Sequence, residues 1–261
     1  MKYCIIPLLM GTLSSLGVAS EPELLLDIDF AAASENVRGT LIVPNSEKAD
    51  ASSGEDVTVV AKTLGGNAYT LDDVASEDGR TFLKSQPERK SYLEVVLPES
   101  TAPGNDNFSV AFWFKPAARE TVPGFLLSAG TSAPTWILQS TDDDHLRIMF
   151  DGHSGDGTGR TLTHTSKMPL NPGEWNHVAV VFDRNDSILV YLNGTLDSYS
   201  QPISSHPEAM PGRIYLAGPY EYSSGDFGRI RLFRGKLSED QIQKLANAQD
   251  VSEYTGVRLT D

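Results

Sequence analysis

The sequence predicts an all-β protein, an antiparallel two-sheet β-sandwich with one short C-terminal helix. Many short apolar segments are separated by Gly-, Pro- and Asn-rich turns at intervals of about 8–12 residues, which is typical of sandwiches. Residues 175–182 are apolar on both faces, so this strand is expected to be central in a stacked sheet. Residues 188–192 run into Asn193-Gly194, a strong hairpin signal because both residues tolerate positive φ.

The first twenty residues have the layout of a secretory signal peptide. They combine a basic start, an apolar run over 5–16 and small residues at 17–20, so cleavage is expected after Ala19 or Ser20. The alternative is a retained membrane anchor, which would need about 20 unbroken apolar residues. We therefore expect an exported protein, secreted outside the cell, into the periplasm or to the cell surface. Its expected parts are a signal peptide at 1–20, one domain at 21–250 and a C-terminal tail at 251–261.

Charge and cysteine content narrow the class of protein. The chain has 261 residues and a formal net charge of −14, and removal of residues 1–20, with one lysine and no acidic residue, takes this to −15. Such a charge disfavours nucleic acid and anionic membrane as partners. The single cysteine, Cys4, lies in the signal peptide, so the mature domain is expected to rely on its core without disulfides. No later segment is apolar enough for membrane insertion, and the oligomeric state stays open.

The first half of the domain is expected to supply strands of unequal clarity. Residues 24–30 alternate between apolar and acidic side chains in their second half, and this pattern predicts the first strand. The pattern is weak from there to residue 78, with β-like pieces at 39–43 and 57–63 separated by a polar, Ser-rich stretch. Two further strands are expected at 81–83 and 92–97.

The second half carries the clearer strands. Residues 108–115 place four large apolar side chains on one face, and Pro116 ends the run. Further strands are expected at 125–129, 136–140, 146–150, 161–165, 213–218 and 227–233. The one helix is predicted after Ser238, which forms a capping box with Gln241 and is followed by apolar residues at helical spacing.

Several of these segments carry motifs of a known family. The strand Glu174-Trp175-Asn176-His177-Val178-Ala179 and the hairpin Tyr191-Leu192-Asn193-Gly194 are similar to its x-W-x-H-(V/L)-A and Y-(V/L)-N-G motifs. Further matches lie at 79–82, 92–95, 108–116, 225–233 and 237–242. Together they resemble the laminin G-like, concanavalin A-like jelly-roll domains of exported bacterial proteins, over residues 79–247 and more weakly at 24–30. The resemblance implies the fold and no particular ligand. Gly228 departs from it, because many relatives carry an acidic residue there that can serve a cation.

Aromatic and acidic residues in the rim loops are the candidate ligand-binding residues. The loop 218–226 combines Tyr220 and Tyr222 with Glu221 and Asp226, and aromatic faces can stack on sugars while acids take hydroxyls or calcium. Trp136, at the start of a strand, is a further candidate platform for a sugar ring. The alternatives are an ordinary polar loop whose tyrosines shield the sandwich edge, and core or rim packing for Trp136.

Four aspartates are candidates for a calcium site. Asp142 and Asp144 belong to a run of three, and Asp151 and Asp156 lie in the Gly-rich loop 151–160. Calcium takes about six to eight oxygens from several segments, and this loop lacks the EF-hand order, so a solvated turn is the alternative. No other cofactor is expected, since the histidines lack the spacing of a zinc site.

Three residues of the central strands are expected to be structural. Trp113 and Trp175 lie in apolar strands, and we expect them in the sandwich core. His177 shares a strand face with Trp175 and is expected to be a hydrogen-bonded, non-catalytic histidine.

These features favour a secreted, non-catalytic binding module that recognises a polysaccharide, or an extracellular protein or matrix partner, through its rim loops. Glycoside hydrolases of this fold present paired carboxylates as Glu-x-Asp-x-x-Glu along a strand, and the chain lacks that sequence and a Gly-x-Ser-x-Gly nucleophile motif. The alternatives are a polysaccharide hydrolase or lyase with dispersed catalytic residues, and a purely structural surface module.

Overall fold

The fold is taken from a computed structural model. It describes residues 21–35, 41–44, 57–65, 67–99, 102–117, 124–130, 134–151, 161–203, 209–219 and 221–248. The predicted signal peptide and C-terminal tail lie outside these residues. In the described part, no helix is long and apolar enough to cross a membrane.

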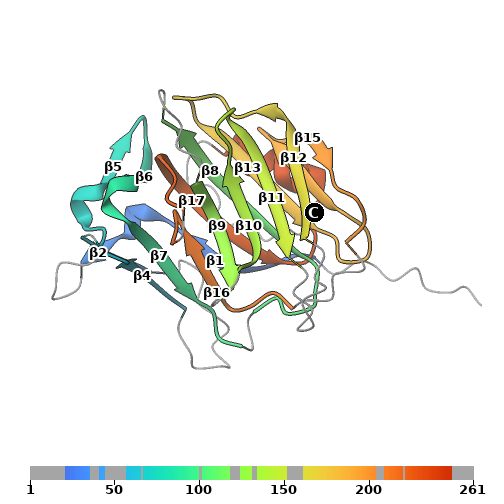
Figure 1. Cartoon of the computed structure of the whole chain (residues 1–261), viewed down its shortest axis with the longest axis horizontal. Coiled ribbons are helices and arrows are strands. Elements are labelled where there is room, and N and C mark those ends of the chain that lie inside the picture. Colours follow the sequence, from blue (N-terminus) through green and yellow to red (C-terminus); the bar gives the residue numbers. More distant parts are fainter. Residues whose placement is uncertain are drawn as a thin grey trace, which may run out of the picture.

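Two antiparallel sheets account for most of the described chain (Figure 1). Sheet A has the order β15 (Thr195–Tyr199), β14 (Ile188–Leu192), β13 (Asn176–Phe182), β8 (Phe108–Pro116), β17 (Gly225–Arg234), β6 (Arg80–Ser85) and β5 (Val74–Glu77). Strand β1 (Glu23–Ile28) also pairs with β17. Sheet B has the order β12 (Thr161–Pro169), β11 (His145–Asp151), β10 (Pro134–Ser140), β9 (Gly124–Gly130), β16 (Arg213–Leu216), β7 (Ser91–Val96), β4 (Thr58–Thr63), β3 (Leu41–Pro44) and β2 (Ser34–Glu35).

The main core lies between the two sheets. Strand β8 contributes Phe108, Val110, Phe112 and Phe114, all at most 1% exposed, from the face that the alternation predicts. Strand β13 pairs directly with β8 and adds every second residue from Val178 onward to the same core. Burial of these side chains is the main stabilising term, at about 1.5–3 kcal/mol for each fully buried large apolar residue.

A second, smaller core covers the outer face of sheet A. Helix α1 (Glu239–Asn247) buries Ile242 and Leu245 against Ala111, Ala179 and other outward-facing residues of β8, β13 and β17. This explains why 175–182 is apolar on both faces: one face meets sheet B and the other meets the helix. Ser238 caps α1 by accepting the backbone N–H of Gln241, as its capping box predicts.

The predicted all-β sandwich with one helix is confirmed, with local differences. Strand β1 ends at Ile28 because Asp29 accepts the N–H of Ala31 and starts the 3-10 helix η1 (Phe30–Ala32). Strands β2 and β5 were not anticipated, since both are short and polar. Two further 3-10 turns are η2 (Leu71–Asp73) and η3 (Pro87–Arg89).

The Asn-Gly hairpin is also confirmed. Asn193 and Gly194 have φ values of +51° and +81° and join β14 to β15. The Asn193 side chain accepts a hydrogen bond from the backbone N–H of His177, so this turn also holds the start of β13 in place.

Candidate functional site

The structure separates the predicted rim residues of the 218–226 loop. Glu221 is exposed and accepts a hydrogen bond from Gln139 Nε2 at 2.5 Å, on the sheet B side. Tyr222 is partly exposed, and its ring packs against Gly218. Asp226 belongs to β17 of sheet A, in register with Lys84 and Lys115. Tyr220 lies outside the described residues, and of the two acids Glu221 contacts sheet B whereas Asp226 belongs to sheet A.

Trp136 is in the core, which corrects its assignment as a sugar platform. Its side chain is 1% exposed and packs against Phe108 and Phe182, with ring centroids 6.0 and 5.7 Å apart. Its indole N–H has no hydrogen-bond partner within the described chain. A ligand in solution cannot reach this ring.

The candidate calcium ligands do not form a cluster in the described part of the chain. Asp142 is exposed in the turn between β10 and β11, and Asp144 follows it at φ +64°. Within the described ranges, no group of three His, Cys, Asp or Glu side chains is placed to hold a metal ion. The side chain of Asp151 and the whole of Asp156 lie outside the described residues, so the calcium site stays a prediction.

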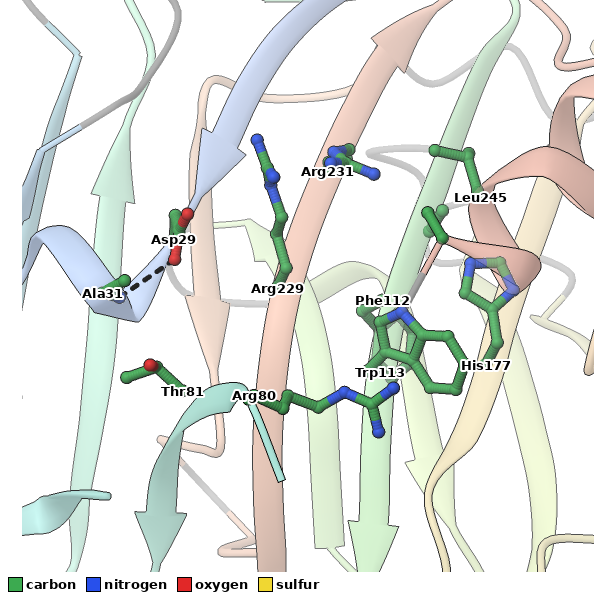
Figure 2. A pocket seen from close by; sticks show the side chains of 13 residues that line it. Asp29, Ala31, Arg80, Thr81, Phe112, Trp113, His177, Arg229, Arg231 and Leu245 are labelled. Atoms are coloured by element: carbon green, nitrogen blue, oxygen red, sulfur yellow. Dashed lines mark hydrogen bonds between the residues drawn. The ribbon is translucent and has the colours of Figure 1, made fainter. Parts of the chain in front are cut away.

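A pocket of about 100 Å³ lies on the outer face of sheet A, beside α1. Its lining comes from Asp29 and Ala31 just after β1, the start of β6, strands β8, β13 and β17, and the C-terminal half of the helix (Figure 2). The pocket exists because β17 changes partners there: β6 pairs with it only up to Phe227, and β1 pairs with it from Ile230 onward. Between these two ladders, one edge of β17 is left open.

A β-bulge in β17 shapes the same place. Gly228 and Arg229 both lie opposite Trp113, because the register with β8 shifts between Phe227 and Ile230. A Cβ on Gly228 would come within 2.9 Å of the Trp113 Cβ, so a glycine is needed for the ring to lie there. The position at which this chain departs from its relatives therefore creates room for an aromatic residue.

Arg229 is held in place by a buried carboxylate. Its Nε donates to Asp27 Oδ1 at 2.6 Å and its Nη2 donates to Asp27 Oδ2, while Arg231 Nε lies 3.3 Å from Asp27 Oδ1. Asp27 is 2% exposed. The third nitrogen of Arg229, Nη1, is buried and has no hydrogen-bond partner in the described chain. A fixed guanidinium with a spare donor is a means of binding an oxygen-bearing ligand.

Arg80 lies over two tryptophan rings. Its guanidinium carbon is 4.2 Å from the ring centroid of Trp113 and 4.9 Å from that of Trp175. Figure 2 shows Arg80 extending from the start of β6 across β17 toward Trp113. Burial lowers the pKa of Arg80. Both tryptophans are partly exposed on the outer face of sheet A, which corrects their expected place in the core.

His177 lies on the other side of Trp113, its register partner on β8. The two ring centroids are 5.1 Å apart. His177 is 2% exposed, and burial, with Arg231 and Arg80 nearby, lowers its pKa to about 3, so the ring is neutral at pH 7. Its Nδ1 has no hydrogen-bond partner in the described chain, so the hydrogen bond that we expected of this histidine is not made through that atom among the described residues.

The described lining of the pocket is mainly cationic. Three arginines line it, and Asp29 is the single carboxylate among the described lining residues. Asp29 is engaged by the N–H of Ala31. Two buried polar atoms of the lining, Arg229 Nη1 and His177 Nδ1, have no partner among the described residues. Unpaired groups of this kind cost free energy unless a ligand or water satisfies them.

Sequence reasoning did not find this site. Arg80 and Arg229 are far apart in sequence and stand in no motif, and the tryptophans were assigned to the core because their strands are apolar. The one available signal was Gly228, where an otherwise conventional strand lacks a side chain. A glycine within a strand often marks a bulge or a close approach of another group.

Fold and site together define an antiparallel β-sandwich with a small cationic and aromatic pocket on one outer face. The family model described as the concanavalin A-like lectin/glucanases superfamily matches residues 89–243, more than half of the chain. The protein belongs to this superfamily. A comparison with curated proteins finds no match.

Solved structures with the same fold include receptor-binding domains of botulinum neurotoxins. The binding domain of neurotoxin DC, in complex with rat synaptotagmin II, is 13% identical, with 87% of this chain and 51% of that chain covered and a TM-score of 0.57. A structure of neurotoxin type C, whose cell entry depends upon interaction with two ganglioside molecules, is 14% identical, with 88% and 52% covered and a TM-score of 0.59. The chain spans about half the length of these structures, and the likeness shows the fold.

Proposed function

We propose that this protein is a secreted, non-catalytic binding module that recognises an extracellular polysaccharide through the pocket on sheet A. The observation that carries the proposal is a preorganised pocket with two buried nitrogen atoms, the Arg229 Nη1 donor and His177 Nδ1, that have no partner within the described chain. Sugars offer hydroxyl and ring oxygens that satisfy such groups, and the partly exposed Trp113 ring in the lining offers an apolar contact for the C–H groups of a sugar.

The lining chemistry supports binding without catalysis. Glycosidases of most families need two carboxylates on either side of the bond, about 5–10 Å apart. Asp29 is the one carboxylate among the described lining residues, and nearby Asp27 is neutralised by two arginines. The described lining therefore does not present the pair of carboxylates that such hydrolysis requires.

A protein partner is the second candidate. The neurotoxin structures that share this fold concern both a protein, synaptotagmin, and gangliosides. The fold therefore suits either class of partner, and the rim loops predicted from the sequence remain available for a protein contact.

A glycan array followed by isothermal calorimetry tests the proposal. We expect the mature protein to bind at least one plant, algal or microbial polysaccharide without releasing reducing sugar or unsaturated product. Parallel titrations with and without calcium test the predicted cation site. Product release would show an enzyme instead. Absence of binding to every glycan, together with a protein partner recovered by pull-down, would overturn the carbohydrate proposal.

Export is part of the same proposal and has its own test. The intact mass of the protein recovered from the medium or the periplasm should match a chain cut after Ala19 or Ser20. A full-length chain in the membrane fraction would favour a retained anchor.

A further inference from the structure

We propose that the pocket on sheet A binds an acid group, so that the ligand is an acidic polysaccharide held by its carboxylate or sulfate groups. This inference rests on the proposed function and narrows it from polysaccharides in general to charged ones. It is carried by the two arginines that the fold positions but leaves incompletely paired.

Arg229 supplies an oriented donor. Its contacts with Asp27 through Nε and Nη2 fix the plane of the guanidinium, and they leave Nη1 buried without a partner in the described chain. The side chain is 10% exposed, so the donor is largely shielded from solvent. A carboxylate or sulfate oxygen is the strongest partner for such a donor, because charge-assisted hydrogen bonds are roughly twice as strong as neutral ones.

Arg80 supplies a cation for which the described residues provide no anion. The described residues give its guanidinium two indole rings and no carboxylate. A partly buried cation is costly unless a negative group is nearby, and the rings offset only part of that cost. An acid group bound in the pocket would supply the missing charge.

The balance of charge in the pocket is opposite to that of the whole chain. Arg80, Arg229 and Arg231 together outnumber the two nearby carboxylates, Asp27 and Asp29, whereas the chain carries a net charge of −14. The long-range field of the protein repels an acidic polymer, so binding must come from short-range contacts at this place. Such an arrangement favours selective recognition over general adhesion to polyanions.

The size of the pocket limits how much of the polysaccharide it can hold, and His177 forms part of its lining. The His177 ring is neutral and lines the pocket, so it adds no charge to the contact with the acid group. A pocket of about 100 Å³ holds one acid group and part of its sugar, not a whole chain segment. We therefore expect one unit of the polymer to be anchored at a time.

The test compares three oligomers of equal length by calorimetry: galacturonate, sulfated galactan and uncharged galactan. Two variants address the pocket: Arg80→Met, which keeps the stem packed between the rings, and Arg229→Lys, which keeps the charge beside Asp27. Arg213→Met, which removes an arginine paired with Glu94 on sheet B, is the matched control. Folding of each variant is checked by circular dichroism.

We expect at least one acidic oligomer to bind the wild type and the Arg213→Met control equally. Arg80→Met and Arg229→Lys should each weaken that binding about tenfold to a hundredfold, the range for one charge-assisted hydrogen bond. Preference for galacturonate or for sulfated galactan identifies the acid group. Equal binding of uncharged galactan, or no effect of either pocket variant, overturns this inference while the proposed function stands. Failure of every glycan, on the array as well, overturns the proposed function itself.

A measurement on the wild type covers the case in which the variants do not fold. Galacturonate oligomer added to ¹⁵N-labelled protein should shift the indole N–H signals of Trp113 and Trp175. The signal of buried Trp136 should stay in place. Shifts confined to residues of sheet B would contradict the assigned pocket.

Discussion

Acidification from pH 7 to pH 5 is expected to lower the free energy of unfolding by about 2 kcal/mol through His177. Burial, with Arg231 and Arg80 nearby, lowers its pKa from 6.5 to about 3, so the folded protein keeps the ring neutral throughout this range. The unfolded chain takes up a proton near pH 6.5 and therefore binds more protons than the folded state. Stability falls as the pH drops below 6.5, at about 1.4 kcal/mol per pH unit, until the folded ring also protonates near pH 3.

Two other groups with shifted pKa values, His164 and Asp226, set the controls. Burial lowers the pKa of His164 as well, so that residue adds to the loss of stability in the same direction. Burial raises the pKa of Asp226, against the effect of Lys115 and Lys84, and this favours the folded state at lower pH. The contribution of His177 is therefore measured as the difference between the wild type and His177→Gln in how the free energy of unfolding changes with pH.

Urea unfolding followed by tryptophan fluorescence at pH 7, 6 and 5 measures this difference. Between pH 7 and pH 5, the free energy of unfolding should fall by about 2 kcal/mol less in His177→Gln than in the wild type. This expectation holds whatever the effect of the substitution on stability at pH 7. His164→Gln is the matched control and should reduce that fall by a smaller amount, since that ring is only partly buried. An unaltered pH dependence in His177→Gln would refute the reasoning, because it would mean that the folded state accommodates the proton.

Three further predictions concern stability. Trp136→Ala should lower the free energy of unfolding by about 3–5 kcal/mol because the ring is 1% exposed, and a loss below about 1 kcal/mol in urea would place it at the surface. Gly228→Val should lower the free energy of unfolding by about 1–3 kcal/mol and shift tryptophan fluorescence, because the new Cβ would lie 2.9 Å from that of Trp113. An unchanged melting temperature would contradict the bulge geometry. Ser238→Ala should cost about 1 kcal/mol by removing the oxygen that accepts the Gln241 N–H, whereas Ser238→Asp should retain most of the stability in thermal unfolding.

Local patterns were sufficient to predict most of the architecture. Alternation identified the four large apolar side chains of 108–115 that share one face, turn chemistry identified the hairpin at Asn193-Gly194, and a capping box identified the start of α1 at Ser238. These features depend on neighbours in sequence, since the period of two and the φ preference of glycine act within a few residues.

Local patterns did not predict which face of a tryptophan-bearing strand is buried. Alternation places Trp113 opposite to Phe112 and Phe114 but does not say which of the two faces meets the other sheet. Trp136, a candidate for the surface, is in the core, while Trp113 and Trp175, candidates for the core, are partly exposed. The distinction depends on what packs on each face, which the pattern of a single strand does not contain.

The sequence by itself determined the class of fold, the position of the helix, the turns and the family, because each depends on local periodicity or on motifs within one strand. Tertiary structure alone decided the pocket. It brings the start of β6, the end of β1 and the bulge of β17 to one place, where Arg80 and Arg229 line a common cavity. Sheet pairing joins segments that are remote in the chain, so their side chains meet only once the strands are in register.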